Sequence, residues 1–182
     1  MGLHQLHDKT FGPYLSGDEI CNRIEGLAAQ IQSDYQSRKT VFLIILNGAF
    51  IFAADLLKRI NIQAEISFVK VSSYQGTSSS GKIKSVLGID IDLKGKDVII
   101  IEDIVDTGLT LDYLLKTLNS HQPSSIEVAS LLFKKEAYQK DFPIKYIGFE
   151  IPDNFVVGYG LDYNGLGRNM NEILTLKTDN TC

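Results

Sequence analysis

The sequence predicts an α/β fold in which a mostly parallel central sheet is flanked by helices. Short, continuous apolar runs recur along the chain, and amphipathic segments with helical periodicity separate them. Uninterrupted apolar strands of this kind are typical of parallel sheets that helices cover on both faces. A chain of 182 residues is expected to form one domain. Such sheets bind ligands beyond the carboxyl ends of their strands, so we expect the binding and catalytic residues in the loops that follow the strands.

The composition excludes several classes of function. The chain has 18 Lys and Arg against 22 Asp and Glu, so it lacks the basic excess with which proteins neutralise nucleic acid. It has no apolar run of about 18 residues, the length of a membrane span, and its N-terminus lacks the basic and then apolar order of a secretory signal. Two cysteines, Cys21 and Cys182, are too few for a disulfide framework or a zinc cluster. We therefore expect a soluble, cytoplasmic protein with neither a nucleic-acid nor a membrane partner.

The first part of the chain predicts a helix, a strand and a second helix. Ser16 and Glu19 have the spacing of a capping box, so a helix is expected from about residue 16 to residue 36. Its apolar stripe follows the helical period and consists of Ile20, Ile24, Leu27, Ala28, Ile31 and Tyr35. The apolar run 41–46 is too short for a buried helix and predicts a strand, and 50–60 predicts the second helix.

The remainder of the chain predicts further strands with one helix among them. Alternation from residue 64 towards 71 indicates a strand, and another is expected at 83–87. The run 98–101 predicts a second fully buried strand, followed by an acidic loop and a helix to about residue 118. Strands are also expected at 126–133 and 146–151, and short strand-like pieces at 155–176.

The acidic loop after the strand 98–101 is the strongest signal in the chain. Glu102 and Asp103 follow the strand directly, and Asp106 comes three residues later. Gly108 allows a tight turn, and the amides of Thr107 to Thr110 lie at a helix start, where unpaired N–H groups bind phosphate. Carboxylates accept hydrogen bonds from sugar hydroxyls and help to hold divalent cations. The loop therefore suits a molecule that has a phosphate at one end and a diol in its middle.

Plainer interpretations of this loop also stand. It could be an acidic turn whose Asp and Thr side chains only cap the next helix, although clustered acids repel and need a compensating partner. The triplet Asp106–Gly108 occurs in aspartic proteases, but those proteins are all-β and this segment is a strand followed by a helix. The phosphatase signature needs acids two positions apart, whereas Asp103 and Asp106 are three apart.

At this loop the sequence resembles the type I phosphoribosyltransferases and, more narrowly, the hypoxanthine-guanine phosphoribosyltransferases. Five segments between about residues 40 and 168 appear in the order found in that family: LNGAFIFAADL (46–56), VSSYQGTSSSGKIK (71–84), VIIIEDIVDTGLT (98–110), VASLLFKKEA (128–137) and GFEIPDNFVVGYGLDYN (148–164). The resemblance implies a core at about 38–150 and a small hood built from about 1–15 and 151–182.

The resemblance also implies an activity. Hypoxanthine, and guanine as well, would react with phosphoribosyl pyrophosphate to give IMP or GMP and pyrophosphate in purine salvage, with Mg²⁺ as the cofactor. A homodimer or homotetramer would be the working assembly. Two alternatives stay open: a nucleotide-sensing regulator that keeps this fold as a binding module, and an enzyme that prefers xanthine.

Family roles can be placed on the acidic loop. Glu102 and Asp103 would bind the ribose hydroxyls directly or through Mg²⁺. Asp106 would act as general base or acid towards N7 of the purine. The 5′-phosphate would be held by the loop formed by Asp106, Thr107, Gly108, Leu109 and Thr110.

Other family roles fall on the purine side. Lys134 would donate to O6 of the base, so that adenine is rejected; without the resemblance it would be a surface lysine with a buried stem. Phe155 would stack on the base and Val156 would contact its edge through the backbone, although the Phe-Val-Val run is otherwise typical of a core strand. Asp162, also on the purine side, would coordinate a second Mg²⁺ next to the pyrophosphate.

The last roles concern pyrophosphate and the closing loop. Asn47 and Gly48 match the family loop that receives the leaving group through backbone amides, and many relatives have lysine where this chain has Asn47. Arg168 would reach the pyrophosphate. Ser73 and Tyr74 match a mobile loop that closes over the reacting centre and excludes water, whereas the composition of 72–82 alone suggests a flexible linker.

Overall fold

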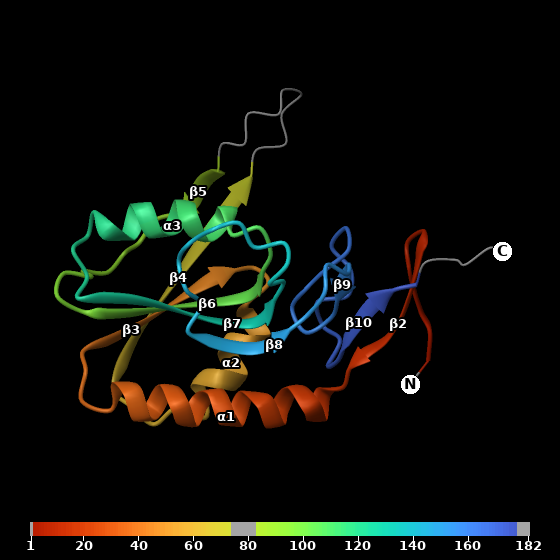
Figure 1. Ribbon diagram of the computed structural model, residues 1–182, viewed down its shortest axis with the longest axis horizontal. Helices are drawn as coiled ribbons and strands as arrows, with labels where there is room; N and C mark the ends of the chain where they lie inside the picture. Colours follow the sequence, from red (N-terminus) through yellow and green to blue (C-terminus); the bar gives the residue numbers. More distant parts are fainter. Residues whose placement is uncertain (1, 74–82, 178–182) are drawn as a thin grey trace.

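The computed structural model describes residues 2–73 and 83–177 as two sheets and three helices (Figure 1). The larger sheet has the strand order β5-β4-β3-β6-β7-β8. Five of these strands run parallel: β3 (Thr40–Leu46), β4 (Ala64–Ser73), β6 (Asp97–Val105), β7 (Ser125–Phe133) and β8 (Tyr146–Glu150). Strand β5 (Ile83–Leu87) is antiparallel to β4 at one edge. The predicted fold class is confirmed.

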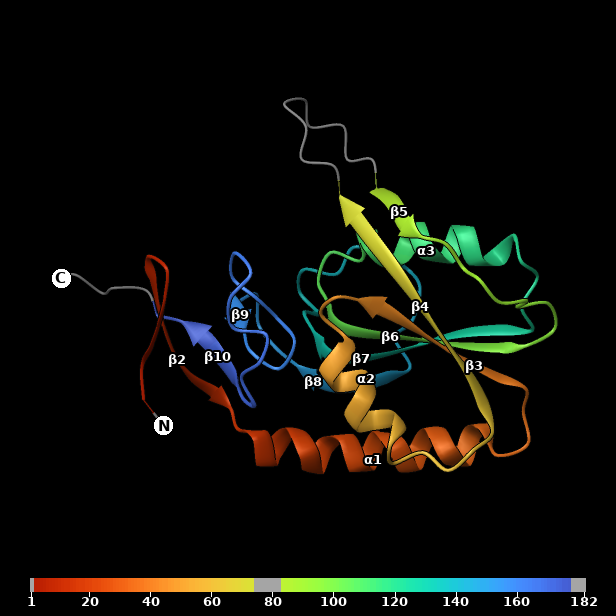
Figure 2. The ribbon, with the colours of Figure 1, turned by 180° about the vertical axis from the view of Figure 1, so that it is seen from behind.

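Helices cover both faces of this sheet (Figures 1 and 2). Helices α1 (Gly17–Tyr35) and α2 (Phe50–Leu57) pack on one face, and α3 (Leu109–Asn119) packs on the other. Successive strand residues point to opposite faces. In β6, Ile99 and Ile101 therefore join the core under α1 and α2, while Val98 and Ile100 join the core under α3. Among the described helices, none has the length and apolar character to span a membrane.

The predicted start of the first helix is confirmed in detail. Ser16 is the N-cap of α1: its Oγ accepts from the Glu19 amide at 3.3 Å, and its own amide donates to Glu19 Oε2 at 2.9 Å. This reciprocal capping box satisfies two amides that the helix itself leaves unpaired. All six residues of the predicted apolar stripe are buried.

Two element ends differ from the prediction. Helix α2 ends at Leu57 rather than at residue 60, because the chain tightens into i→i−3 bonds such as Ile60 N to Leu57 O at 3.2 Å. Strand β6 continues to Val105, since its pairing with β7 extends to the partners Val105 and Phe133. Glu102 and Asp103 therefore lie in the last part of the strand, not in the loop after it.

The two chain ends form a second, antiparallel sheet, the hood. Its strand order is β1-β2-β10-β9, with β1 (His4–Leu6), β2 (Lys9–Leu15), β9 (Val156–Val157) and β10 (Ile173–Leu176). Its small core consists of Leu6, Phe11, Val157 and Leu174. In Figure 2 the hood lies on the side towards which β3 points, so it faces the carboxyl end of that strand.

Candidate functional site

The carboxyl ends of β3, β6 and β7 bring three predicted segments of the site together. Strand β6 pairs with both other strands, so the loop after β3, the acidic end of β6 and Lys134 after β7 are neighbours. The hood segment 153–168 reaches the same place, because Asp153 contacts Lys134 and Gly160 packs on Gly48. Residues far apart in the sequence thus meet at one end of the sheet.

Glu102 and Asp103 are adjacent, half-buried carboxylates in the last part of β6. Burial, with a smaller contribution from the charge of Asp103, raises the pKa of Glu102 well above its ordinary value. Burial also raises the pKa of Asp103 to about 6, although the Ile104 amide donates to Asp103 Oδ1 at 2.9 Å. Within the described residues, Glu102 Oε2 is buried without a hydrogen-bond partner. Two such carboxylates need a positive partner, and a hard divalent cation suits their oxygens.

The protein alone does not complete a metal site in the part of the chain that the structure describes. No group of three or more His, Cys, Asp or Glu side chains is placed to hold a metal ion there. The acidic pair therefore fits a cation that takes its remaining ligands from a bound substrate or from water.

A cavity of about 260 Å³ adjoins the acidic pair and is lined by residues 102–111. Gly108 is the N-cap of α3 and has a φ of +81°, and a Cβ there would collide with the Tyr138 ring. The first amides of α3 have no acceptor inside the helix and carry the positive end of its dipole. The loop is therefore shaped to receive an anion such as a phosphate.

Lys134 is buried at the carboxyl end of β7, with only 7% of its surface exposed, so the surface-lysine interpretation is wrong. Its Nζ contacts Asp106 Oδ2 at 3.0 Å and Asp153 Oδ1 at 2.8 Å. Burial lowers the pKa of Lys134, but the hydrogen bonds that it donates to Asp153 and Asp106 outweigh this effect and raise the pKa above its ordinary value. Lys134 is thus a fixed positive charge inside the site.

Phe155 and Val156 lie at the edge of the hood. Phe155 is 44% exposed, and its ring packs edge-on against Tyr163, with 5.8 Å between ring centroids. Lys9 Nζ lies 5.4 Å from the centroid of the same ring. Val156 is buried and pairs with Thr175 of β10. An exposed aromatic ring beside a buried strand offers a flat surface on which a planar base can stack.

Asp162 and Arg168 bind each other. Asp162 Oδ1 contacts Arg168 Nη2 at 2.5 Å, and Asp162 Oδ2 accepts from the Gly165 amide at 2.7 Å. Both carboxylate oxygens of Asp162 are therefore engaged within the hood. A metal ion at Asp162 would have to compete with Arg168.

Asn47 and Gly48 form the turn between β3 and α2. Asn47 is exposed, and the Leu46–Asn47 peptide bond is cis. Gly48 lies between the Asp103 carboxylate and Gly160, and a Cβ on Gly48 would collide with Asp103. The backbone of Ser73 ends β4, whereas Tyr74 and the loop 74–82 lie outside the described residues.

The sequence prediction missed three residues that belong to this arrangement: Asp55, Asp153 and Tyr159. Asp153 stands two residues before Phe155 in the segment 148–164, so its position next to a candidate residue was the available signal. Asp55 and Tyr159 share a hydrogen bond of 2.5 Å between their side chains. No local pattern indicates this bond, because 104 positions separate the two residues.

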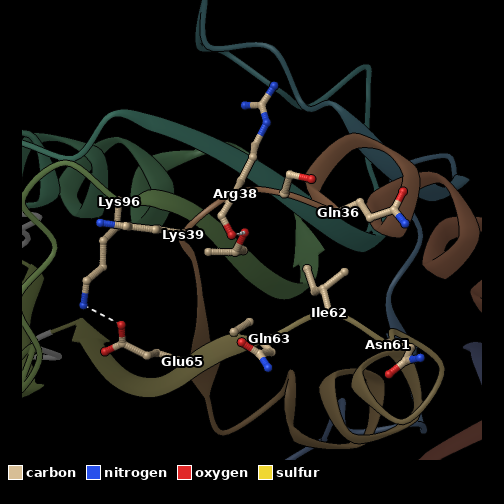
Figure 3. Close-up of a pocket in the computed structure, with 11 residues that line it drawn as sticks. Gln36, Arg38, Lys39, Asn61, Ile62, Gln63, Glu65 and Lys96 are labelled. Carbon is tan, nitrogen blue, oxygen red and sulfur yellow. Dashed lines mark hydrogen bonds and ion pairs between the residues drawn. The ribbon is translucent and has the colours of Figure 1, made fainter.

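A larger cavity of about 750 Å³ lies at the other end of the strands, next to the amino ends of β3 and β4 (Figure 3). It is lined by residues 36–40, 61–65 and 96, among which Lys96 extends to Glu65 at 2.5 Å. None of the predicted site residues lines it. Open α/β sheets bind ligands beyond the carboxyl ends of their strands, so the smaller acidic cavity is the candidate site.

Comparisons with known proteins identify the family of the chain. Residues 13–164 match the profile of the phosphoribosyl transferase domain. Hypoxanthine-guanine phosphoribosyltransferases of Staphylococcus epidermidis and Staphylococcus aureus are 42% and 41% identical over 175 residues, which cover 96% of this chain and 98% of each relative.

Solved structures give the same result. A hypoxanthine phosphoribosyltransferase from Staphylococcus aureus superposes with a TM-score of 0.86 at 42% identity, covering 91% of both chains. One from Trypanosoma cruzi, solved as a ternary substrates complex, gives a TM-score of 0.84 at 35% identity and covers 91% of this chain and 94% of its own. With a matching domain profile, relatives of nearly full length and a shared fold, the chain belongs to the phosphoribosyl transferase family.

Proposed function

We propose that this protein transfers the 5-phosphoribosyl group of phosphoribosyl pyrophosphate to hypoxanthine, and also to guanine, in purine salvage. The observation that carries the proposal is the half-buried pair Glu102 and Asp103, with Glu102 Oε2 unpartnered in the described part of the chain, directly beside the amide loop 107–110. The relatives of nearly full length, which are named hypoxanthine-guanine phosphoribosyltransferases, support it. They give no support to the nucleotide-sensing regulator.

The acidic end of β6 would bind the sugar phosphate. Glu102 and Asp103 would accept hydrogen bonds from the two ribose hydroxyls. The amides and hydroxyls from Asp106 to Thr110 would hold the 5′-phosphate at the start of α3, with Leu109 contributing its backbone. The sugar would then be held through its 5′-phosphate and its two hydroxyls, and its C1 would face the hood.

Mg²⁺ is the cation that we propose for this site. When bound, it would offset the charges of Glu102 and Asp103 and those of the pyrophosphate oxygens. Asp162 would serve a second Mg²⁺ on the pyrophosphate side if it exchanged Arg168 for the cation. Glu102 Oε2, which is buried without a hydrogen-bond partner among the described residues, supports the Mg²⁺ position at Glu102 and Asp103.

The purine would lie between Lys134 and the hood. Lys134 would donate to O6 of the base, Phe155 would stack on the ring and the backbone of Val156 would contact its edge. N9 would form the bond to C1 as the bond from C1 to the pyrophosphate oxygen breaks, and Asp106 would take the proton that N7 carries. Adenine has an amino group at position 6 and cannot accept from Lys134, so it should be rejected.

The leaving pyrophosphate would be received by the loop after β3. The backbone at Asn47 and Gly48 would donate to it, and Arg168 would add a positive charge. Ser73 and Tyr74 would belong to the loop that closes over the reacting centre and keeps water from hydrolysing the donor. A homodimer or homotetramer is the proposed assembly, and light scattering after gel filtration measures it.

One assay tests the proposal. The purified protein is incubated with Mg²⁺, phosphoribosyl pyrophosphate and hypoxanthine, guanine, xanthine or adenine in parallel, and nucleotide formation is followed by absorbance. We expect reaction with hypoxanthine and guanine, none with adenine, and loss of activity with EDTA. A preference for xanthine would replace the substrate assignment. No product from any base, together with salt-dependent binding to nucleic acid, would favour a regulator instead.

A further inference from the structure

A continuous series of contacts joins α2 to the acidic pair through the hood. It runs from Asp55 through Tyr159 and Gly160 to Gly48 and Asp103. Tyr159 Oη donates to Asp55 Oδ2 at 2.5 Å. Gly160 lies against the Gly48 carbonyl, and Gly48 lies against the Asp103 carboxylate. The hood therefore contacts the loop after β3 through Gly160 and Gly48, next to Tyr159.

Tyr159 has a backbone conformation that tyrosine rarely adopts. Its φ is +50°, in the left-handed region, and its side chain is almost wholly buried. Such a backbone persists only where its surroundings determine it strongly. The hydrogen bond to Asp55 is one such constraint, and Asp55 is itself held by Lys58, whose Nζ lies 2.7 Å from Asp55 Oδ1.

The protonation states suit this bond. Burial raises the pKa of the Tyr159 hydroxyl, and the bond to Asp55 raises it further, so the hydroxyl remains a donor. Burial raises the pKa of Asp55, but the bonds from Lys58 and Tyr159 outweigh it and lower the pKa overall. Asp55 therefore remains an ionised acceptor, which makes the bond a charge-assisted one.

Gly160 follows Tyr159 in the chain and contacts two groups of the candidate site, Gly48 and Arg168. A Cβ at Gly160 would collide with the Gly48 carbonyl, so the two backbones are in direct contact. Arg168 Nη1 donates to the Gly160 carbonyl at 2.6 Å, and the Gly160 amide donates to the Arg168 carbonyl at 2.9 Å. A shift of Gly160 would therefore move the Gly48 loop and the Arg168 guanidinium together.

We propose that Tyr159 is a positioning residue for pyrophosphate: its bond to Asp55 fixes Gly160 and thereby sets the Gly48 loop against Arg168. The inference rests on the proposed function, in which these two groups receive the leaving group. Asn47 brings no charge to the loop, so the placement of the Arg168 guanidinium counts heavily. An amide and a guanidinium hold one anion well only when both point at it.

The chain contains a matched control for this bond. Tyr146 Oη donates to Asp34 Oδ2 at 2.6 Å and joins the amino end of β8 to α1, away from the candidate site. Tyr146 is also fully buried, and burial likewise raises its pKa. Tyr146→Phe and Tyr159→Phe therefore remove the same kind of hydrogen bond from similar surroundings.

The experiment measures the reverse reaction, in which IMP and pyrophosphate give hypoxanthine and phosphoribosyl pyrophosphate. For Tyr159→Phe we expect the KM for pyrophosphate to rise about fivefold or more and the KM for IMP to stay within about twofold. Asp55→Asn should act in the same direction. The double variant should be no worse than the more affected single variant, since both changes disrupt one bond. Tyr146→Phe should lower the melting temperature and leave both KM values in place.

The outcomes separate the two proposals. A wild-type protein that catalyses neither direction would overturn the proposed function. An active wild type whose Tyr159→Phe variant keeps its KM for pyrophosphate, or changes both KM values equally, would overturn the positioning role alone. Should Tyr159→Phe be recovered unfolded, Asp55→Asn carries the same comparison against Tyr146→Phe.

Discussion

The Lys134 ammonium lies 3.0 Å from the Asp106 carboxylate. The group proposed to hold O6 of the purine is therefore bound to the group proposed to take the proton from N7. The same ammonium also contacts Asp153 at 2.8 Å. In the proposed reaction, O6 of the purine would take one hydrogen bond of Lys134 while Asp153 keeps another, so binding of the purine would also free Asp106 to accept the N7 proton.

Asp106→Asn should reduce kcat by about 100-fold or more, the usual scale of a lost general base, with much smaller changes in both KM values. Asparagine keeps the shape of the side chain but cannot take the proton. Steady-state kinetics with hypoxanthine checks this. Asp112→Asn is the control, because Asp112 lies in the first turn of α3 and pairs with Lys116 at the surface. Unchanged turnover in Asp106→Asn would remove Asp106 from its proposed role.

Asp153→Asn should raise the KM for hypoxanthine about three- to tenfold, because Lys134 loses one of two charge-assisted hydrogen bonds that orient it. The KM for phosphoribosyl pyrophosphate should not change. Glu150→Gln removes one negative charge from the neighbouring pair of Lys135 and Glu150, which lie 3.6 Å apart, and serves as the control. Equal effects of the two variants would mean that only the local charge matters.

Gly108→Ala should destabilise the protein by about 1–3 kcal/mol, since alanine at a φ of +81° is strained and its Cβ would meet the Tyr138 ring. Affinity for phosphoribosyl pyrophosphate should fall as well, because the phosphate loop must shift. Gly26→Ala lies in α1 with open space around it and should instead stabilise the protein by about 0.5–1 kcal/mol. Urea unfolding and calorimetric titration measure the two effects. Stabilisation by both variants would contradict the prediction.

Asp103→Asn should stabilise the metal-free protein at pH 7 while reducing activity strongly. The pKa of Asp103 is raised from 3.8 to about 6 in the folded state, so the folded protein binds more protons than the unfolded chain between these values. The contribution of Asp103 to stability is therefore lost as the pH rises through this window. The variant's advantage should be roughly 1–3 kcal/mol at pH 7 and should vanish near pH 4. Urea unfolding in EDTA at both pH values tests this, and an advantage that persists at pH 4 would point to another cause.

Local signals in the sequence predicted most of the fold and the side of the site that lies on β6. The Ser16 and Glu19 pair placed the start of α1, since both capping partners lie within one helical turn. The run 98–110 located the acidic pair and the loop proposed to bind phosphate, because a buried strand, its charged end and the following helix are contiguous in sequence.

What the sequence did not predict depends on contacts between distant segments. The end of β6 was placed at residue 101 because charged residues follow, but pairing with β7 keeps the strand extended to Val105. The local sequence around Lys134 is typical of a surface lysine. Its burial is explained by the ion pairs with Asp106 and Asp153, which come from other segments of the chain. The bond between Tyr159 and Asp55 likewise exists only after the hood has folded against α2.

The order of strands in the hood has a consequence for how the protein is made. In the described chain β10 lies between β2 and β9, so the strand that carries Val156 is joined to the N-terminal strands only through residues 173–176. Every described strand of the central sheet precedes those residues in the chain, so a ribosome makes these strands first. The part of the candidate site on β6 can therefore form with the central sheet, whereas the part in the hood cannot assemble before residues 173–176 have been made.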